Sequence, residues 1–125
     1  MRRGEIWWAS LGEPQGSAPG HRRPVLIVQA NEFNESAIRT SICAAMTSNM
    51  RLADAPGNVR VTRRAGGLPQ ESVVNVSQLI TLDKQRLTEK VGRLPAESLR
   101  DVEAGIKAGP RAIGAARHVR TYLPS

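Results

Sequence analysis

The chain has 125 residues, which suits one compact domain, and 40% of them are hydrophobic, which is enough for an ordinary core. Its 18 Lys and Arg against 11 Asp and Glu give a net charge of +7. This charge indicates a polyanion such as nucleic acid, or an acidic protein, as partner; a basic surface that only keeps the protein soluble is the alternative. No stretch approaches the ~20 apolar residues that cross a bilayer, and one cysteine excludes an internal disulfide framework. We therefore expect a soluble, cytoplasmic protein that does not act at a membrane.

The first half of the chain predicts three strands and one long loop. Strands are expected over Glu5–Ala9, Pro24–Ala30 and Thr40–Thr47. The unbroken aliphatic run in the second of these is typical of a strand that is buried on both faces. The intervening stretch from Leu11 to Arg23 is rich in glycine and proline and is predicted to be a loop. Asn31–Ser36 is predicted to be a turn or a single helical turn.

The second half predicts two more strands and a closing helix. Asn58–Thr62 and Ser72–Leu82 alternate as strands do, whereas Leu87–Lys90 is predicted to be a short helix. Pro95–Ala108 is predicted to be an amphipathic helix, with an apolar stripe formed by Leu99, Val102 and Ile106. The expected fold is mainly β with short helices (α+β), a strongly curved antiparallel barrel or sheet closed by the C-terminal helix.

The last segment differs in character from the rest. Arg111, Arg117 and Arg120 have no acidic neighbours in the sequence. We divide the chain into a domain over residues 1–110 and a basic tail over 111–125. The tail is predicted to be mobile, with a helical extension as the alternative.

Two short motifs carry candidate chemistry. Gly16–Pro24 is a glycine-rich loop that contains Arg22 and Arg23; backbone N–H groups and guanidinium forks of this kind bind phosphate. The alternative is a solvated turn in front of a strand. The motif Thr47–Asn49 ends another strand with two hydroxyls and an amide, which predicts a turn or a cap, or else contacts to a phosphate or a base edge.

Other chemistry is poorly supported. Asp54, Asp83 and Asp101 are isolated along the chain, and neither His21 nor His118 has a second ligand at a useful spacing, so we expect no metal and no cofactor. Cys43 lies within a predicted strand and is expected to be a buried, inert thiol.

The order of the motifs resembles the MazF/PemK toxin family. The resemblance is carried by Arg3–Trp8, Gly16-Ser17, His21–Gln29, Thr47–Asn49 and several later motifs, namely Leu68-Pro69, Ser72–Asn75, Gln78–Lys84 and Arg93-Leu94. It implies an SH3-like barrel, usually a homodimer, that cuts single-stranded RNA without a metal. It also implies a cognate antitoxin whose acidic, flexible C-terminal segment covers the RNA groove.

The resemblance assigns catalytic roles to Arg23 and Thr47. We expect RNA contacts from residues in and next to these motifs: Ser17, Gly20, His21, Arg22, Ser48, Asn49 and Gln78. Trp7 and Trp8 are adjacent on a strand and should point to opposite faces, one into the core and the other towards a base or a dimer interface.

Three departures from the family pattern stand out. Ala18 replaces a glutamate that many members have. Asn75 and Ser77 stand where the PemK branch has an arginine and an aspartate. Residues 111–125 match nothing in the family pattern.

The expected reaction uses the nucleophile that RNA itself carries. Attack by the 2′-OH on the adjacent phosphorus gives a 2′,3′-cyclic phosphate and a 5′-OH end. Arg23 would stabilise the charge that develops, and Thr47 would donate a hydrogen bond. His21 is a candidate for proton transfer, the alternative being a solvent-facing histidine. Two functions from other classes stay open: a gyrase-poisoning toxin of the CcdB type, and an RNA-binding barrel without catalysis.

Overall fold

Strands dominate the architecture. The structure, a computed structural model, describes residues 1–12, 22–112 and 118–122. Its strands are β1 (Glu5–Ser10), β2 (Arg22–Ile27), β3 (Thr40–Thr47), β4 (Val59–Val61), β5 (Ser72–Asp83), β6 (Leu87–Arg93) and β7 (His118–Tyr122). Its helices are α1 (Asn31–Asn34), α2 (Arg63–Gly66) and α3 (Ala96–Ala112), with 3-10 turns η1 (Met50–Asp54) and η2 (Lys84–Arg86). The sheet order is β4-β5-β3-β2-β1-β6, all antiparallel, and β7 adds to β5 in parallel.

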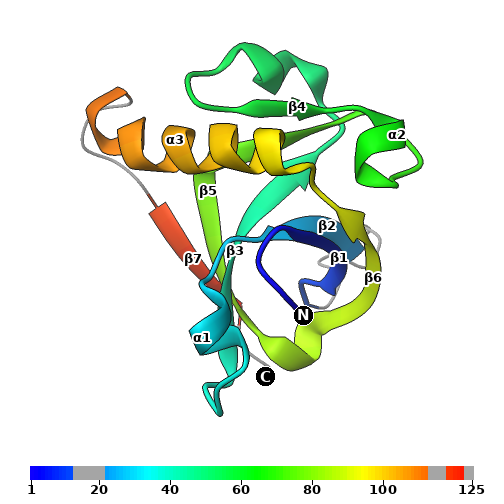
Figure 1. The fold of residues 1–125 in the computed structure, drawn as a ribbon, viewed down its shortest axis with the longest axis vertical. Helices are drawn as coiled ribbons and strands as arrows, with labels where there is room; N and C mark the ends of the chain where they lie inside the picture. The colour runs from blue at the N-terminus through cyan, green and yellow to red at the C-terminus, as the bar shows by residue number, and fades with distance from the viewer. Residues whose placement is uncertain (13–21, 113–117, 123–125) are drawn as a thin grey trace.

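The sheet curls and buries both of its faces. Alternate residues of one strand enter different hydrophobic clusters: in β2, Leu26 belongs to one cluster, and Val25 and Ile27 belong to the other. Helix α3 covers the first cluster through Leu99, Val102 and Ile106, its predicted apolar stripe. The second cluster takes its buried members from β1, β2, β3 and β5. Figure 1 shows β1, β2 and β6 wound into a ring, with α3 lying across the sheet above it. The predicted curved antiparallel fold with a closing helix is confirmed.

Both tryptophans of β1 are partly buried. Trp8 packs against the cluster under α3, and Trp7 packs against the second cluster on the opposite face. The expected opposition of the two rings is confirmed, but each ring contributes to a core. The prediction that only one of them fills the core is wrong, because the curled sheet has a hydrophobic cluster on each face.

A large bulge divides β5 into two halves. Ala45 of β3 pairs with Asn75, yet the preceding Ala44 pairs with Leu79, so residues 76–78 have no partner in β3. Asn75 stabilises the bulge because its Oδ1 accepts from the backbone N–H of Ser77 at 3.2 Å and from the Ser77 hydroxyl at 2.6 Å. Before the bulge β5 pairs with β4, and beyond it β5 pairs with β7.

Three predicted element types or boundaries are wrong. Strand β2 spans Arg22–Ile27 rather than Pro24–Ala30, because its pairing with β1 extends to Arg22. Leu87–Lys90 is not a helix but the start of β6, because pairing with β1 overrides the helix-forming tendency of this short segment. Helix α3 extends past Ala108 to Ala112, so Pro110 lies in its last turn rather than beyond its end.

The C-terminal tail contains a strand, which neither the mobile nor the helical interpretation predicts. Residues 118–122 form β7 and pair with residues 78–82 of β5. The division of the chain at residue 110 stays a prediction.

Two glycines let α3 approach the loop before β4. A Cβ added to Gly105 would lie 2.3 Å from the carbonyl oxygen of Gly57, closer than any side chain tolerates. Gly57 itself has φ of +80°, a conformation that side chains other than glycine rarely adopt. The contact therefore requires glycine on both elements.

Within the part of the chain that the structure describes, no helix is long and apolar enough to cross a membrane.

Candidate active site

The site begins where Pro24 interrupts the pairing of two strands. Strand β2 pairs with β1 from Arg22 to Leu26, but its ladder with β3 begins only at Val25, opposite Ala45. Proline has no N–H to donate, which is consistent with a ladder that stops there. Extending the same register by two residues places Arg23 opposite Thr47. The two predicted catalytic residues thus lie at the ends of neighbouring strands, where β2 and β3 no longer pair with each other.

A cavity of about 150 Å³ opens at these strand ends. Its walls come from β1, β2, β3 and the segment that leads into β5: Trp8, Arg22, Arg23, Pro24, Met46, Thr47, Ser48, Leu68, Pro69, Gln70 and Ser72. Both predicted catalytic residues line this cavity, as do the predicted RNA-binding residues Arg22 and Ser48. The lining contains two arginines and no acidic side chain. The cavity therefore favours an anionic ligand.

The Thr47–Asn49 motif forms a turn and also contributes to the cavity. The Oγ1 of Thr47 accepts a hydrogen bond from the backbone N–H of Asn49 at 3.1 Å. Asn49 in turn caps η1, where its Oδ1 accepts from the backbone N–H of Arg51 at 3.2 Å. Because the Thr47 oxygen acts as the acceptor in its bond with Asn49, its hydroxyl proton remains available for donation. Asn49 does not line the cavity.

Arg22 and Arg23 have different surroundings although both are exposed. The Nη2 of Arg22 donates to Oε2 of Glu89 at 2.8 Å, and its guanidinium carbon lies 4.6 Å from the centre of the Trp8 ring. Arg23 forms no ion pair with any residue that the structure describes. Among the described residues, Arg23 therefore has no acidic partner for its positive charge.

Among the described residues, the predicted RNA-binding residue Gln78 does not line the cavity. Gln78 lies in the β5 bulge, where its backbone pairs with β7 at His118. Ser17, Gly20 and His21 lie outside the described residues. The sequence analysis missed Gln70 and Ser72, which line the cavity; Ser72 is buried, and its hydroxyl donates to the carbonyl of Gln70 at 3.2 Å. The Leu68-Pro69 motif, which directly precedes Gln70 in the sequence, was the signal that could have indicated these two residues.

Two groups outside the cavity have shifted pKa values. Burial alone would raise the pKa of the Glu5 carboxyl, but hydrogen bonds from Lys90, Trp7 and the backbone of Arg2 outweigh burial and lower it to about 2. The Lys90 ammonium lies 2.9 Å from Oε2 of Glu5. Burial raises the pKa of the Cys43 thiol to about 12, which agrees with the inert thiol that we predicted.

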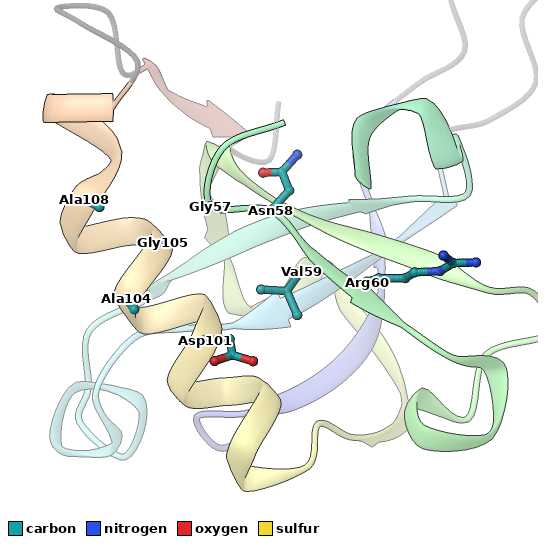
Figure 2. A pocket seen from close by; sticks show the side chains of 8 residues that line it. All are labelled: Gly57, Asn58, Val59, Arg60, Asp101, Ala104, Gly105 and Ala108. Carbon is teal, nitrogen blue, oxygen red and sulfur yellow. The ribbon is translucent and has the colours of Figure 1, made fainter. Parts of the chain in front are cut away.

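Other parts of the molecule offer less chemistry. No group of three or more His, Cys, Asp or Glu residues able to hold a metal occurs among the described residues. A second cavity, of about 550 Å³, lies between α3 and the loop before β4 (Figure 2), lined by Gly57, Asn58, Val59, Arg60, Asp101, Ala104, Gly105 and Ala108. Arg60 pairs with Glu71, and Figure 2 shows its side chain directed away from α3. No predicted site residue lines this cavity.

Comparison with known proteins decides the family. Residues 2–109 match the sequence profile of the PemK-like, MazF-like toxins of type II toxin-antitoxin systems. The chain belongs to this family. It is 47% identical over 107 residues to endoribonuclease MazF6 of Mycobacterium tuberculosis, which covers 86% of this chain and 94% of that protein. Endoribonuclease EndoA of Bacillus subtilis is 34% identical over 107 residues, with 86% and 91% covered.

Solved structures show the same fold. The MazE–MazF complex of Deinococcus radiodurans superposes with a TM-score of 0.72 at 21% identity and covers 93% of this chain and 97% of that one. The M. tuberculosis toxin MazF-mt6 gives 0.69 at 23% identity, with 90% and 98% covered. The present MazF/PemK-family chain is therefore an endoribonuclease of the MazF type. This result confirms the enzymatic interpretation over the two non-enzymatic alternatives.

Proposed function

We propose that this toxin cuts single-stranded RNA at short sequences, without a metal ion, through attack of the 2′-OH on the adjacent phosphorus. The products are a 2′,3′-cyclic phosphate and a 5′-OH end. The observation that carries the proposal is the cavity shared by Arg23 and Thr47, which holds two guanidinium groups and no carboxylate. A site of this charge attracts a phosphodiester and stabilises the extra negative charge of its transition state.

Arg23 is the charge stabiliser. Its guanidinium has planar donors that match two phosphate oxygens. No described acidic residue competes for those donors. Its proposed contribution is therefore electrostatic.

Thr47 orients the reacting groups. Its oxygen already accepts from the N–H of Asn49, so its own proton points elsewhere and can be donated to a phosphate oxygen or the 2′-oxygen. The cavity lining offers no carboxylate or imidazole. The 2′-OH proton must therefore pass to a group beyond this lining. His21, two residues before Arg23, is our candidate, and solvent is the alternative.

The positive charge of the cavity also bears on how the proposed RNA cleavage is inhibited. Solved relatives include MazE–MazF pairs from D. radiodurans and a mycobacterial endoribonuclease in complex with its cognate antitoxin. We propose that this chain acts in the cytoplasm as a homodimer and is inhibited by a cognate antitoxin with an acidic, flexible C-terminal segment.

The test is cleavage of a long single-stranded RNA in EDTA, followed by analysis of the new ends. Cyclic phosphate and 5′-OH ends are expected. Arg23→Ala should slow cleavage about 100–1,000-fold, as for loss of one preorganised charge stabiliser. Arg100→Ala is the matched control, because Arg100 is exposed on α3 and forms no ion pair with described residues. Cleavage that requires added metal, or 5′-phosphate products, would refute the proposed mechanism.

A further inference from the structure

Arg22, Trp8 and Glu89 form a cluster at the mouth of the cavity, built across three neighbouring strands. Trp8 of β1 pairs on one side with Glu89 of β6 and on the other with Pro24 of β2. Because side chains alternate along a strand, Arg22 lies on the same face as Pro24 and reaches back over the Trp8 ring. The three side chains therefore meet on one face of the sheet.

The cluster fixes the guanidinium of Arg22 from two directions. The ring of Trp8 lies 4.6 Å below it, a distance at which a cation and an aromatic face attract. The carboxylate of Glu89 accepts one of its N–H donors at 2.8 Å. Trp8 is partly buried against the core, whereas the side chains of Arg22 and Glu89 are 53% and 66% exposed. The Trp8 ring is thus held in place by the core, whereas the Glu89 carboxylate is exposed and can be displaced.

Glu89 occupies the position that an anionic ligand would take. Carboxylate and phosphodiester oxygens bind the same guanidinium donors in the same plane. An ion pair between two exposed side chains contributes little to stability, so a phosphate can displace the carboxylate at small cost. Arg22 lines the cavity together with Arg23 and Thr47, so a phosphate that displaces Glu89 would bind beside that cavity.

We infer that Arg22 on the Trp8 ring forms a second phosphate subsite beside the catalytic cavity, and that Glu89 is a built-in competitor for it. The ligand is a phosphodiester of single-stranded RNA next to the one that is cut. This inference rests on the proposed function for its ligand. Arg22 therefore binds substrate, and Glu89 and Trp8 are positioning residues that act through it.

The test is a double-mutant cycle in which the Kd for RNA is measured for each variant. The variants are Glu89→Gln, Arg22→Gln and the double variant, each in an Arg23→Ala background that prevents cleavage. The probe is a fluorescein-labelled 20-nucleotide single-stranded RNA of random sequence, followed by anisotropy. Glu89→Gln should lower Kd about 3–5-fold, and Arg22→Gln should raise Kd about 5–10-fold. Removal of Glu89 should then have no effect once Arg22 is absent.

Glu32→Gln is the matched control, because it removes the same charge from an exposed carboxylate on α1 that pairs with no described cation. Its Kd should change less than twofold. Equal tightening by Glu32→Gln, or tightening by Glu89→Gln that persists without Arg22, would show a general charge effect and overturn the inference.

Cleavage kinetics give the second readout. With Arg23 intact, Glu89→Gln should lower KM and leave kcat unchanged. Unchanged Kd and KM in Glu89→Gln would also overturn the inference. If the wild-type protein does not cut RNA in EDTA, the proposed function fails, yet the binding cycle still decides whether Glu89 and a phosphate compete for Arg22.

Discussion

At the scale of single residues, the site depends on groups whose direction is fixed by neighbours. Thr47 illustrates this: its oxygen is oriented by the backbone N–H of Asn49, and that orientation follows from the turn that ends β3. Arg23 is oriented by its place beside Pro24 in a strand paired only to β1 at that point. Two side chains on different strands thus line one cavity.

Thr47→Val should slow RNA cleavage about 10–100-fold while the protein remains folded. Valine has the same shape but no hydroxyl, so the donor to the reacting phosphate is lost; neutral donors contribute less than charged ones. Thr47→Ser is the control and should retain most activity because it keeps the hydroxyl. The measurement is a cleavage time course under single-turnover conditions. Equal rates for Thr47→Val and the wild type would remove Thr47 from the mechanism.

Glu5→Gln should destabilise the fold at neutral pH by about 2–3 kcal/mol. The Glu5 pKa is about 2 in the folded protein against 4.5 ordinarily, so the stability it contributes is complete above pH 4.5 and is lost as pH falls towards 2. Urea unfolding of the variant and the wild type should therefore differ at pH 7, and the difference should shrink by about half at pH 3. Glu32→Gln, in which no ion pair is lost, should show no such convergence.

At the scale of elements, a helix or strand could be predicted when its own sequence determines it, and could not when its pairing with another strand does. The alternating strands and the apolar stripe of α3 carry their own signal, so β1 to β5 and α3 were predicted nearly as observed. Strand β6 was not, because only its pairing with β1 makes it a strand. Strand β7 depends on the edge of β5 that remains open beyond the bulge, a feature that local sequence does not reveal.

The same division applies to the site. Arg23 and Thr47 come from motifs that stand out in the sequence, and both line the cavity; their catalytic roles stay predictions. Gln78 was predicted to contact RNA, yet it lies in the bulge of β5, pairs with β7 and does not line the cavity. Gln70 and the Glu89–Trp8–Arg22 contact arise from residues far apart in the chain, and no single motif contains them.

Helix α3 should be destabilised by the addition of one methyl group at Gly105. Gly105→Ala should lower the unfolding temperature by roughly 3–10 °C, because the new Cβ meets the Gly57 carbonyl and α3 has to shift. The better helix propensity of alanine offsets only part of this cost, about 1 kcal/mol at most. Ala104→Ser, at the exposed neighbouring position, is the control and should change the unfolding temperature little. An unchanged unfolding temperature in Gly105→Ala would contradict the close contact.

At the scale of the whole molecule, the net charge of +7 acts on every anionic partner at once. The arginines of the cavity should attract both RNA and the acidic antitoxin segment that we propose, so these two ligands should exclude each other. Opposite charges should also make both associations faster at low salt. Regulation and catalysis would then share one surface.

RNA and the isolated acidic segment of a cognate antitoxin should therefore compete for Arg23→Ala protein, which binds without cutting. Adding the segment to a labelled RNA complex should release the RNA completely, and the segment should keep substantial affinity at high salt because its folding buries apolar surface. The measurement is competition anisotropy at two salt concentrations. Simultaneous binding of RNA and the segment would show that the antitoxin acts from another surface.

The lone thiol has a practical consequence. Cys43 is the single cysteine of the chain, is fully buried, and has a pKa of about 12, so almost none of it is the reactive thiolate near neutral pH. A maleimide dye should therefore not label the native protein. The substitution Arg100→Cys, at an exposed position of α3, then creates one labelling position while the native Cys43 stays in place. Each toxin chain can then carry a single fluorophore at a known position. Its binding to RNA and to the antitoxin can be followed in single-molecule measurements.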